Sequence, residues 1–256
     1  VWGMWKTIFL HVAMIWQLCS SLLCSSSPFN TSSLPCLEIP RCISEDNVTF
    51  IINQLSTGKG ESQAYSEVSL CYDNLQLYVT HVAFHQTSIT PTDYNQCNDA
   101  IFNSNVMELF IAPNMEETPH CYNELDISPK NVMFDSGIYN PNLNYSGITG
   151  TTFPCSTSGI SHDVVVDEKN ALWRAEMAFP FSLLNCPFSC PLARYCGHST
   201  PNNIYRANFF RISELIPTSK CSSTSCEYLA WNPTMRDPPA FHEPTQFGYL
   251  LLQDLE

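Results

Sequence analysis

Apolar and polar residues alternate along much of the chain in short stretches, which is the pattern of β-strands with one buried face. Residues 64–71 alternate in this way, and the turn-forming pair Asp73-Asn74 follows them. The more continuous apolar run from Leu75 to Phe84 predicts a strand with both faces covered. Further strands are predicted at 106–111, 121–127, 132–134, 164–166, 172–179, 205–212, 228–231 and 248–252.

Helical patterns are scarce, and the best candidate is a turn or two at 181–184, entered through Pro180. Many short strands, separated by turns in a chain with 18 prolines, predict an all-β fold, a β-sandwich of the immunoglobulin-like or jelly-roll-like kind. Long loop insertions are expected at 135–163 and at 213–226. Because no repeat or internal boundary interrupts residues 46–256, we expect one β-sandwich domain there.

The first 26 residues have a different character. Lys6 precedes an apolar run that reaches Leu23, and small residues follow, which is the pattern of a secretory signal peptide. Polar breaks such as Gln17 make a membrane-spanning helix a poorer fit. A start codon would give Met4, so residues 1–3 are interpreted as a translation overhang, and residues 27–45 as a Ser-, Pro- and Cys-rich lead-in. The mature chain is expected to be secreted and extracellular, with no transmembrane segment.

The cysteines and the glycosylation sequons agree with export. Two of the 13 cysteines lie in the expected signal peptide, and the 11 that remain suit an oxidising compartment. Their spacing matches no usual zinc signature, so disulfides are favoured, and the odd number leaves one cysteine free or paired with another molecule. The loop 36–42 is expected to be closed by its own disulfide. Sequons predict N-linked glycans at Asn30, Asn47 and Asn144.

The formal net charge of −13 restricts the partners. An acidic surface repels phosphate backbones, so nucleic acid is not expected as a partner, whereas a neutral ligand or calcium fits. Oxygen ligands for Ca²⁺ could come from Asp73, Asp93, Asn98 and Asp99, but their spacing is not that of a dedicated calcium loop. Ca²⁺ is therefore left open as a cofactor, without assigned ligands.

An ordered series of short motifs runs from about Gln63 to Leu252, nearly the whole mature chain. The motifs are Cys71-Tyr72-Asp73-Asn74, Leu77-Tyr78-Val79, Met107-Glu108-Leu109-Phe110-Ile111, Tyr122-Asn123-Glu124-Leu125, Ser128-Pro129, Trp173-Arg174-Ala175-Glu176-Met177-Ala178-Phe179-Pro180-Phe181, Tyr205-Arg206-Ala207-Asn208-Phe209-Phe210-Arg211-Ile212, Ala230-Trp231-Asn232-Pro233-Thr234, Phe241-His242-Glu243-Pro244 and Phe247-Gly248. Each motif alone is weak, but their order and spacing resemble the carbohydrate-binding modules of family nine. These β-sandwich modules are often appended to xylan- and cellulose-degrading enzymes.

The resemblance implies a sugar site lined by aromatic side chains on two loops, with polar groups beside them. The aromatic position of the closing loop falls on Phe241, ahead of His242, and the other falls on Phe102, before the acidic strand. Family members that bind sugars tend to carry tryptophan at both places. Arg236 and Asp237 are candidates for the groups that bind sugar hydroxyls. Stacking suits a sugar because the apolar C–H face of a pyranose packs on an aromatic plane.

Packing is the alternative role for the aromatic residues. An isolated phenylalanine is more often a core residue than a ligand platform, which applies to Phe102 and Phe241. Trp173 and Trp231 occur in strand-like contexts and are interpreted as core or framework residues.

Two glutamates in the motif series also call for an interpretation. Glu108 and Glu176 each stand between apolar residues and are expected to be half-buried. A glycosidase would use two carboxylates across the scissile bond, at a separation of about 5 to 10 Å. Structural roles, as salt bridges to Arg206 or Arg211, are favoured.

The leading functional hypothesis is a secreted, noncatalytic protein that binds a polysaccharide or its chain end. The sequence contains no Gly-x-Ser-x-Gly, no metal-hydrolase histidine pair and no phosphate-binding glycine loop. Three alternatives stay open. They are a component of O-glycosyl hydrolase activity in carbohydrate catabolism, a haem-binding electron carrier of related architecture, and a protein-binding scaffold with a degenerate sugar site.

Overall fold

The computed structural model describes residues 34–42, 47–86, 92–113, 118–184, 203–216, 218 and 220–253. The signal peptide expected at 1–26 and the sequon at Asn30 lie outside these residues. Within the described ranges, no helix has both the length and the apolar character needed to cross a membrane.

The described residues form thirteen strands that belong to one sheet. The strands are β1 (Cys36–Ile39), β2 (Val48–Leu55), β3 (Glu61–Tyr72), β4 (Gln76–Ala83), β5 (Val106–Pro113), β6 (Cys121–Ile127), β7 (Met133–Tyr139), β8 (Thr149–Thr152), β9 (Ser161–Asp167), β10 (Leu172–Pro180), β11 (Ile204–Glu214), β12 (Cys226–Ala230) and β13 (Gly248–Leu252). A short helix, α2 (Phe181–Leu184), follows β10. A 3-10 turn, η2 (Ile101–Asn103), precedes β5.

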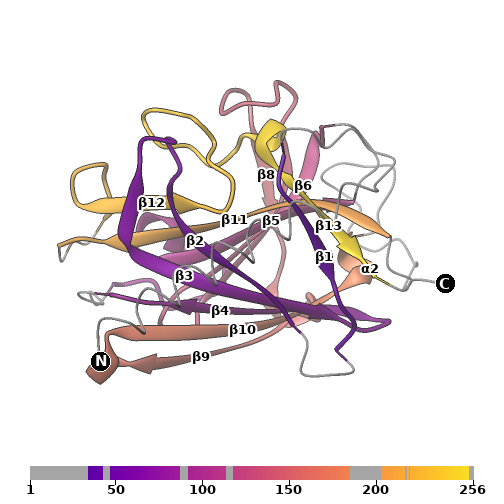
Figure 1. Cartoon of the computed structure of the whole chain (residues 1–256), viewed down its shortest axis with the longest axis horizontal. Helices are drawn as coiled ribbons and strands as arrows, with labels where there is room; N and C mark the ends of the chain where they lie inside the picture. The colour runs from indigo at the N-terminus through magenta and orange to yellow at the C-terminus, as the bar shows by residue number, and fades with distance from the viewer. Residues whose placement is uncertain are drawn as a thin grey trace, which may run out of the picture.

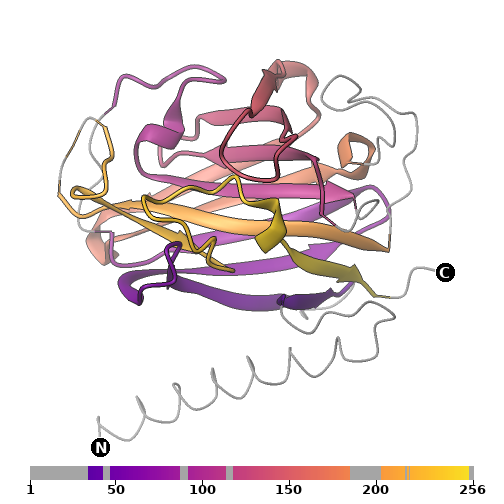
Figure 2. The same ribbon diagram turned by 90° about the horizontal axis from the view of Figure 1, so that it is seen from above.

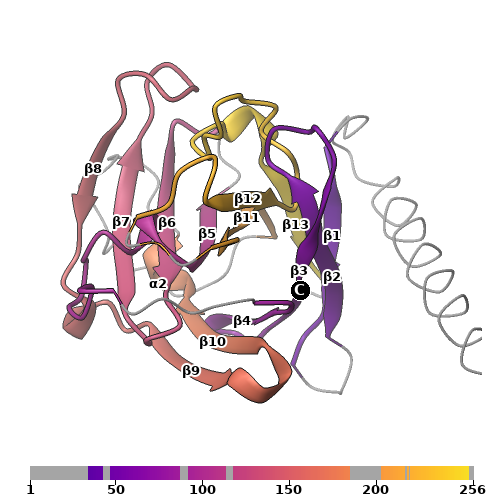
Figure 3. The same cartoon turned by 90° about the vertical axis from the view of Figure 1, so that its left-hand side faces the viewer.

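The strands follow the order β8-β7-β6-β5-β11-β12-β2-β3-β4-β10-β9, and β13 pairs with both β11 and β1 (Figure 1). Neighbouring strands are antiparallel, apart from the parallel pair β1 and β13. In Figure 2 the orange β11 runs between the magenta strands and the indigo ones. Figure 3 shows that the sheet curls, so that β8 to β5 lie on one side of an interior and β10 and β9 close it below. The molecule is thus a β-sandwich made from one curled sheet.

The interior between the two halves of the sheet is apolar. Leu109 on β5, Phe209 on β11 and Trp173 on β10 belong to one buried cluster that fills it. Successive side chains of a strand point to opposite faces, so the next residues, Phe110 and Phe210, point outward. They belong to a second buried cluster on the outer face of β5, β6 and β11, which loops cover. The second cluster is where the candidate site lies.

Every predicted strand overlaps an observed one, and the predicted helical turn at 181–184 is α2. Three strands were not predicted. β8 carries no large apolar residue, β1 has four residues between prolines, and β2 has apolar residues at both odd and even positions, so none shows clear alternation. β1 lies in the segment expected to lead into the domain, and it pairs residue by residue with β13.

Two local predictions need correction. The stretch 135–163, expected to be an insertion loop, contains most of β7, all of β8 and the start of β9. The disulfide expected to close the loop 36–42 is wrong, because Cys42 pairs with Cys71 on β3. Two further disulfides join Cys97 to Cys155 and Cys221 to Cys226, in agreement with the predicted preference for disulfides over zinc.

Candidate functional site

A cavity of about 380 Å³ opens on the outer face of the sheet, over strands β5, β6 and β7. Side chains of β5 to β8, β11 and β12 form its floor, while η2 and the loops around residues 145 and 240 add walls. Its lining residues are Phe102, Glu108, Phe110, Glu124, Phe134, Ser136, Ile138, Tyr145, Gly150, Thr152, Ile212, Tyr228, Pro239, Ala240, Phe241 and His242. Its volume lies within the usual range of small-ligand pockets.

Aromatic rings dominate the walls of the cavity. Phe241 lies flat on Phe210, with ring centroids 4.2 Å apart and an interplanar angle of 11°. Phe241 is 8% exposed, and Phe210 meets Phe110 edge to face at 5.1 Å. Phe102 is 39% exposed and stands edge-on to Phe134 at 5.2 Å. The two phenylalanines singled out from the sequence therefore line one cavity, and Phe102 presents the more accessible ring.

His242 lines the cavity as a neutral, fixed ring. Its Nδ1 atom lies 2.8 Å from the hydroxyl oxygen of Tyr122. The side-chain amide of Asn140 donates to the carbonyl oxygen of His242 at 3.2 Å. Burial lowers the pKa of His242 to about 4, so the imidazole carries no charge at pH 7. Tyr145, which is 66% exposed, lies with its ring centroid 6.1 Å from that of His242.

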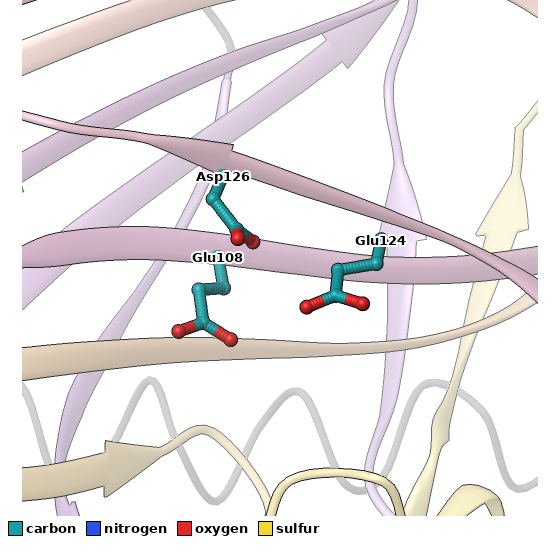
Figure 4. Close-up of side chains that lie close together, drawn as sticks. All are labelled: Glu108, Glu124 and Asp126. Atoms are coloured by element: carbon teal, nitrogen blue, oxygen red, sulfur yellow. The ribbon is translucent and has the colours of Figure 1, made fainter. Parts of the chain in front are cut away.

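Three buried carboxyl groups gather at the floor of the cavity (Figure 4). Glu108 on β5 stands directly opposite Asp126 on β6, and Glu124 lies two residues away on the same face of β6. One oxygen from each of the three lies within 4.8 Å of the others. Glu108 and Glu124 line the cavity itself, and Asp126 lies beside Glu108.

The environment of these carboxyl groups favours their neutral forms. Burial, with the charge of Glu124, raises the pKa of Glu108 well above its usual value. Burial raises the pKa of Glu124 to about 8. Burial also raises the pKa of Asp126, and the charges of Glu108, Glu124 and Asp135 add to that effect. Within the described residues, Oε1 of Glu108 and both carboxyl oxygens of Asp126 have no hydrogen-bond partner. Through Glu108 and Glu124 the floor therefore offers acceptors for a ligand with N–H or O–H donors.

Sequence reasoning found Glu108 but assigned no site role to Glu124 or Asp126. A signal existed, because Tyr122, Glu124 and Asp126 occupy alternate positions of one strand and must share a face. The missing information was which strand lies next to β6, since only the pairing with β5 brings Glu108 opposite Asp126.

Arg236 and Asp237 do not line the cavity. The guanidinium of Arg236 donates to both carboxylate oxygens of Glu243, from Nε at 2.6 Å and from Nη2 at 3.0 Å. Asp237 forms an exposed ion pair with Lys59. Since Glu243 is buried and adjoins His242, the Arg236–Glu243 pair braces the loop that carries the aromatic wall.

The predicted salt bridges of Glu108 and Glu176 to Arg206 or Arg211 are wrong. Glu176 is exposed and forms an ion pair with Arg174 on the same strand. Arg211 points into the interior and donates to oxygen atoms of β3 and of the segment after β4. Arg206 donates to the carbonyl oxygen of the residue before β13. Alternation explains the error for Arg211, because Arg211 and Glu108 lie on opposite faces of paired strands.

The two tryptophans have the framework roles that were predicted. Trp173 is fully buried in the interior. Trp231 packs against Phe50 and Phe209, with ring centroids 5.3 and 6.0 Å away. Neither lines the cavity.

Two of the residues considered for calcium, Asp73 and Asp99, use their carboxylates in local hydrogen bonds. The carboxylate of Asp73 accepts from two backbone N–H groups of the following turn and from the hydroxyl of Tyr78. Asp99 accepts from the backbone N–H groups of Asn95 and Gln96. In the part of the chain that the structure describes, the group of carboxyl or imidazole side chains close enough to share a metal ion is the trio in the cavity.

Known proteins and solved structures that resemble this chain indicate which fold it has. No family model matches the chain. An extracellular protein of Arthroderma benhamiae is 26% identical over 182 residues, which span 68% of this chain and 72% of that protein. Among solved structures, a candidate carbohydrate-binding protein from Bacteroides uniformis matches with a TM-score of 0.63 and 12% identity, over 86% of this chain and all of the other.

A second solved structure is a family-nine carbohydrate-binding module from Caldicellulosiruptor kristjanssonii, in complex with cellotriose. It matches with a TM-score of 0.52 and 13% identity, over 86% of this chain and 95% of that module. The chain therefore has the fold of the family-nine carbohydrate-binding modules, as the motif series predicted. At these identities the likeness concerns the fold.

Proposed function

We propose that this chain is a noncatalytic carbohydrate-binding protein whose ligand occupies the cavity over β5, β6 and β7. The observation that carries the proposal is the composition of this cavity, in which aromatic rings form the walls and the carboxyl groups of Glu108 and Glu124 lie in the floor. A sugar ring needs both, because its C–H face packs on aromatic rings and its hydroxyl groups donate hydrogen bonds.

The solved structures of similar fold support this proposal, since one of them is a module in complex with cellotriose. In this chain Phe102 and Phe241 stand in the cavity as the aromatic platforms, and His242 and Tyr145 complete the wall. Arg236 serves by bracing the loop through Glu243.

A noncatalytic role fits the arrangement of the carboxyl groups. A glycosidase places an acid and its partner on two sides of the scissile bond. Glu108, Glu124 and Asp126 come from one face of two adjacent strands, so all three approach a ligand from below. This arrangement suits ligand binding better than cleavage.

An extracellular location is part of the proposal. The relative from Arthroderma benhamiae is an extracellular protein, and the disulfides between Cys42 and Cys71 and between Cys97 and Cys155 are typical of an oxidising compartment. Glycans at Asn47, which is exposed, and at Asn144 would be compatible with it.

The test is titration of the purified protein with oligosaccharides of several classes, cellotriose among them, by isothermal calorimetry. Phe241→Ala is expected to weaken binding about tenfold or more, because loss of one stacking contact costs about 1.4 kcal/mol. The matched control is Phe84→Ala, which removes a ring stacked on Tyr65 at 4.8 Å outside the cavity and should leave affinity unchanged.

Two outcomes would overturn the proposal. If no oligosaccharide bound in any class, the protein would not be a sugar binder. If chromatography of the same mixtures showed shortened sugars, and Glu108→Gln stopped their formation, the chain would be a glycosidase.

A further inference from the structure

Among the residues that the structure describes, no cationic side chain faces the carboxyl cluster in the cavity. The ionisable groups of the cluster and around it are Glu108 on β5, Glu124, Asp126 and Tyr122 on β6, Tyr228 on β12 and His242 on the loop, and the charge of Asp135, from the other face of β7, also acts on Asp126. His242 is neutral, and its Nε2 atom lies 4.0 Å from Oε2 of Glu124. No lysine or arginine occurs among the described residues that line the cavity. A cationic ligand would therefore supply the positive charge that the described lining residues lack.

The cluster is also incompletely hydrogen-bonded. Glu108 is 3% exposed and lines the cavity, and one of its carboxyl oxygens receives no hydrogen bond from any residue that the structure describes. Asp126 is fully buried beside it, and within the same residues neither of its carboxyl oxygens has a partner. Buried polar groups normally have hydrogen-bond partners, and a buried group left without a partner costs about 1 to 3 kcal/mol of stability. A charged donor such as an ammonium group, with three N–H bonds, meets both needs.

The walls favour an organic cation over a bare metal ion. Metal ions such as Ca²⁺ take six or more oxygen ligands, whereas most of this lining is aromatic. Aromatic faces attract organic cations through their negative π-faces, and they also pack on the C–H face of a sugar ring. The cavity is also much larger than one ion, at about 380 Å³.

We propose that the cavity binds a sugar unit with a free, positively charged amine, such as a glucosamine residue of a polysaccharide. The ammonium group is directed to Glu108 and Glu124, which line the cavity, with Asp126 buried beside Glu108, and the sugar ring packs between the aromatic walls that include Phe102 and Phe241. This inference rests on the proposed sugar-binding function, and it names the class of sugar. The raised pKa of Glu124 adds a consequence, because binding of a cation should release protons from the cluster.

The experiment compares three trisaccharides with the same protein by isothermal calorimetry near pH 6.5, where a sugar amine is protonated. The ligands are the glucosamine trimer, its N-acetylated form and cellotriose. The glucosamine trimer is expected to bind at least about tenfold more tightly than the two neutral sugars. Titrations in two buffers of different ionisation enthalpy are expected to report proton release with the glucosamine trimer alone.

Matched variants assign the effect to the cluster. Glu108→Gln keeps the shape of the side chain and is expected to lower the affinity for the glucosamine trimer about tenfold, because it removes the charge that pairs with the amine, and to lower the affinity for cellotriose by a smaller factor, because an amide oxygen still accepts from a hydroxyl group. Asp126→Asn serves as a second variant in case one fails to fold, which near-ultraviolet circular dichroism would reveal. Glu176→Gln removes an exposed carboxylate elsewhere and should change nothing.

Three other results would overturn the inference, and they differ in whether the proposed sugar-binding function also fails. If cellotriose or the N-acetylated trimer bound as tightly as the amine, the inference would fail while the proposed function stood. If no sugar bound, both would fail. If CaCl₂ bound with an affinity that Glu108→Gln removed, the cluster would be a metal site and not an amine site.

Discussion

Two hollows of similar volume lie on this molecule, one over β5 and β6 and one over β4, β9 and β10. Their volumes are about 380 and 360 Å³. Each contains a glutamate from the middle of a strand, Glu108 in the first and Glu176 in the second. Glu108 is 3% exposed among aromatic rings, whereas the side chain of Glu176 is 49% exposed and is paired with Arg174.

The difference comes from what covers each strand. Over β5, the loop that carries Phe241 and His242 closes against the sheet, so water is excluded from Glu108 and its charge is costly. Over β10, the neighbouring strand β9 is the last of the sheet, and Glu176 reaches solvent and a cation. The same residue type in the middle of a strand is thus an exposed, ion-paired carboxylate in one place and a buried carboxyl group with a raised pKa in the other.

The largest expected effect is a loss of stability, and it should be similar for a large residue on either face of β11. Phe209 packs in the interior and Phe210 supports Phe241 on the outer face, and both are buried. Replacing either by alanine should lower the free energy of unfolding by about 3 to 5 kcal/mol, because each leaves a large cavity. Urea unfolding followed by tryptophan fluorescence measures this loss.

Sugar binding distinguishes these two positions even though stability does not. The milder changes Phe209→Leu and Phe210→Leu keep the protein folded. We expect Phe210→Leu to weaken sugar binding, since Phe241 loses the ring on which it lies, and Phe209→Leu to leave it unchanged. Equal losses of affinity would mean that the outer face has no special part in binding.

The next effect concerns the two glutamates. At pH 8 Glu108→Gln is expected to raise the free energy of unfolding by about 1 to 3 kcal/mol, because it removes a group that is ionised in the unfolded chain and whose charged form burial disfavours in the folded protein. Glu176→Gln is expected to change it by less than about 0.5 kcal/mol, as exposed substitutions usually do. Urea unfolding of both variants at one pH makes the comparison. A destabilised Glu108→Gln would show that the carboxylate accepts strong hydrogen bonds.

The same cluster predicts a pH dependence whose sign can be worked out. The pKa of Glu124 is about 8 in the folded protein, against 4.5 as its ordinary value. Between these values the folded state binds more protons than the unfolded state, so the free energy of unfolding falls as the pH rises. The slope from one such group is at most about 1.4 kcal/mol per pH unit.

Buried histidines act in the opposite direction, but only at lower pH. Burial lowers the pKa of His242 to about 4, and burial, with the charge of Arg211, lowers that of His81 to about 3. Below about 6.5 the unfolded state therefore binds more protons at these sites, and stability rises with pH there. The carboxyl effect is cleanest between pH 6.5 and 8, where stability of the native protein should fall and that of Glu124→Gln should fall less. A flat profile in both would mean that the carboxyl groups titrate normally.

The strands around both cavities could be predicted from the sequence, because the alternation of apolar and polar residues indicates which side chains share a face of a strand. The ten predicted strands overlap observed ones, and the motif series predicted the family-nine fold.

The alternation does not indicate which strand pairs with β5, or which loop covers its outer face. The cluster exists because β6 pairs with β5 in the register that sets Asp126 opposite Glu108, which is long-range information. Likewise, Arg236 was expected to contact the ligand, but its position relative to the cavity depends on how residues 232–247 fold back over the sheet. There it binds Glu243, three residues beyond the loop tip at Ala240.

The smallest effect contrasts two ion pairs of that loop. Arg236 holds the buried carboxylate of Glu243 through two hydrogen bonds, whereas Asp237 meets Lys59 at the surface. Bidentate pairs fix geometry, while exposed single pairs contribute little. Arg236→Lys should therefore lower sugar affinity by about three- to fivefold, because the loop that presents Phe241 is less well held. Lys59→Met should leave affinity within about twofold of the native value. Calorimetry compares the sugar affinities of the two variants, whose changed residues both lie outside the cavity. Equal affinities would show that the Arg236–Glu243 pair does not hold the loop. A larger loss of affinity with Lys59→Met would show that the surface pair supports the aromatic wall.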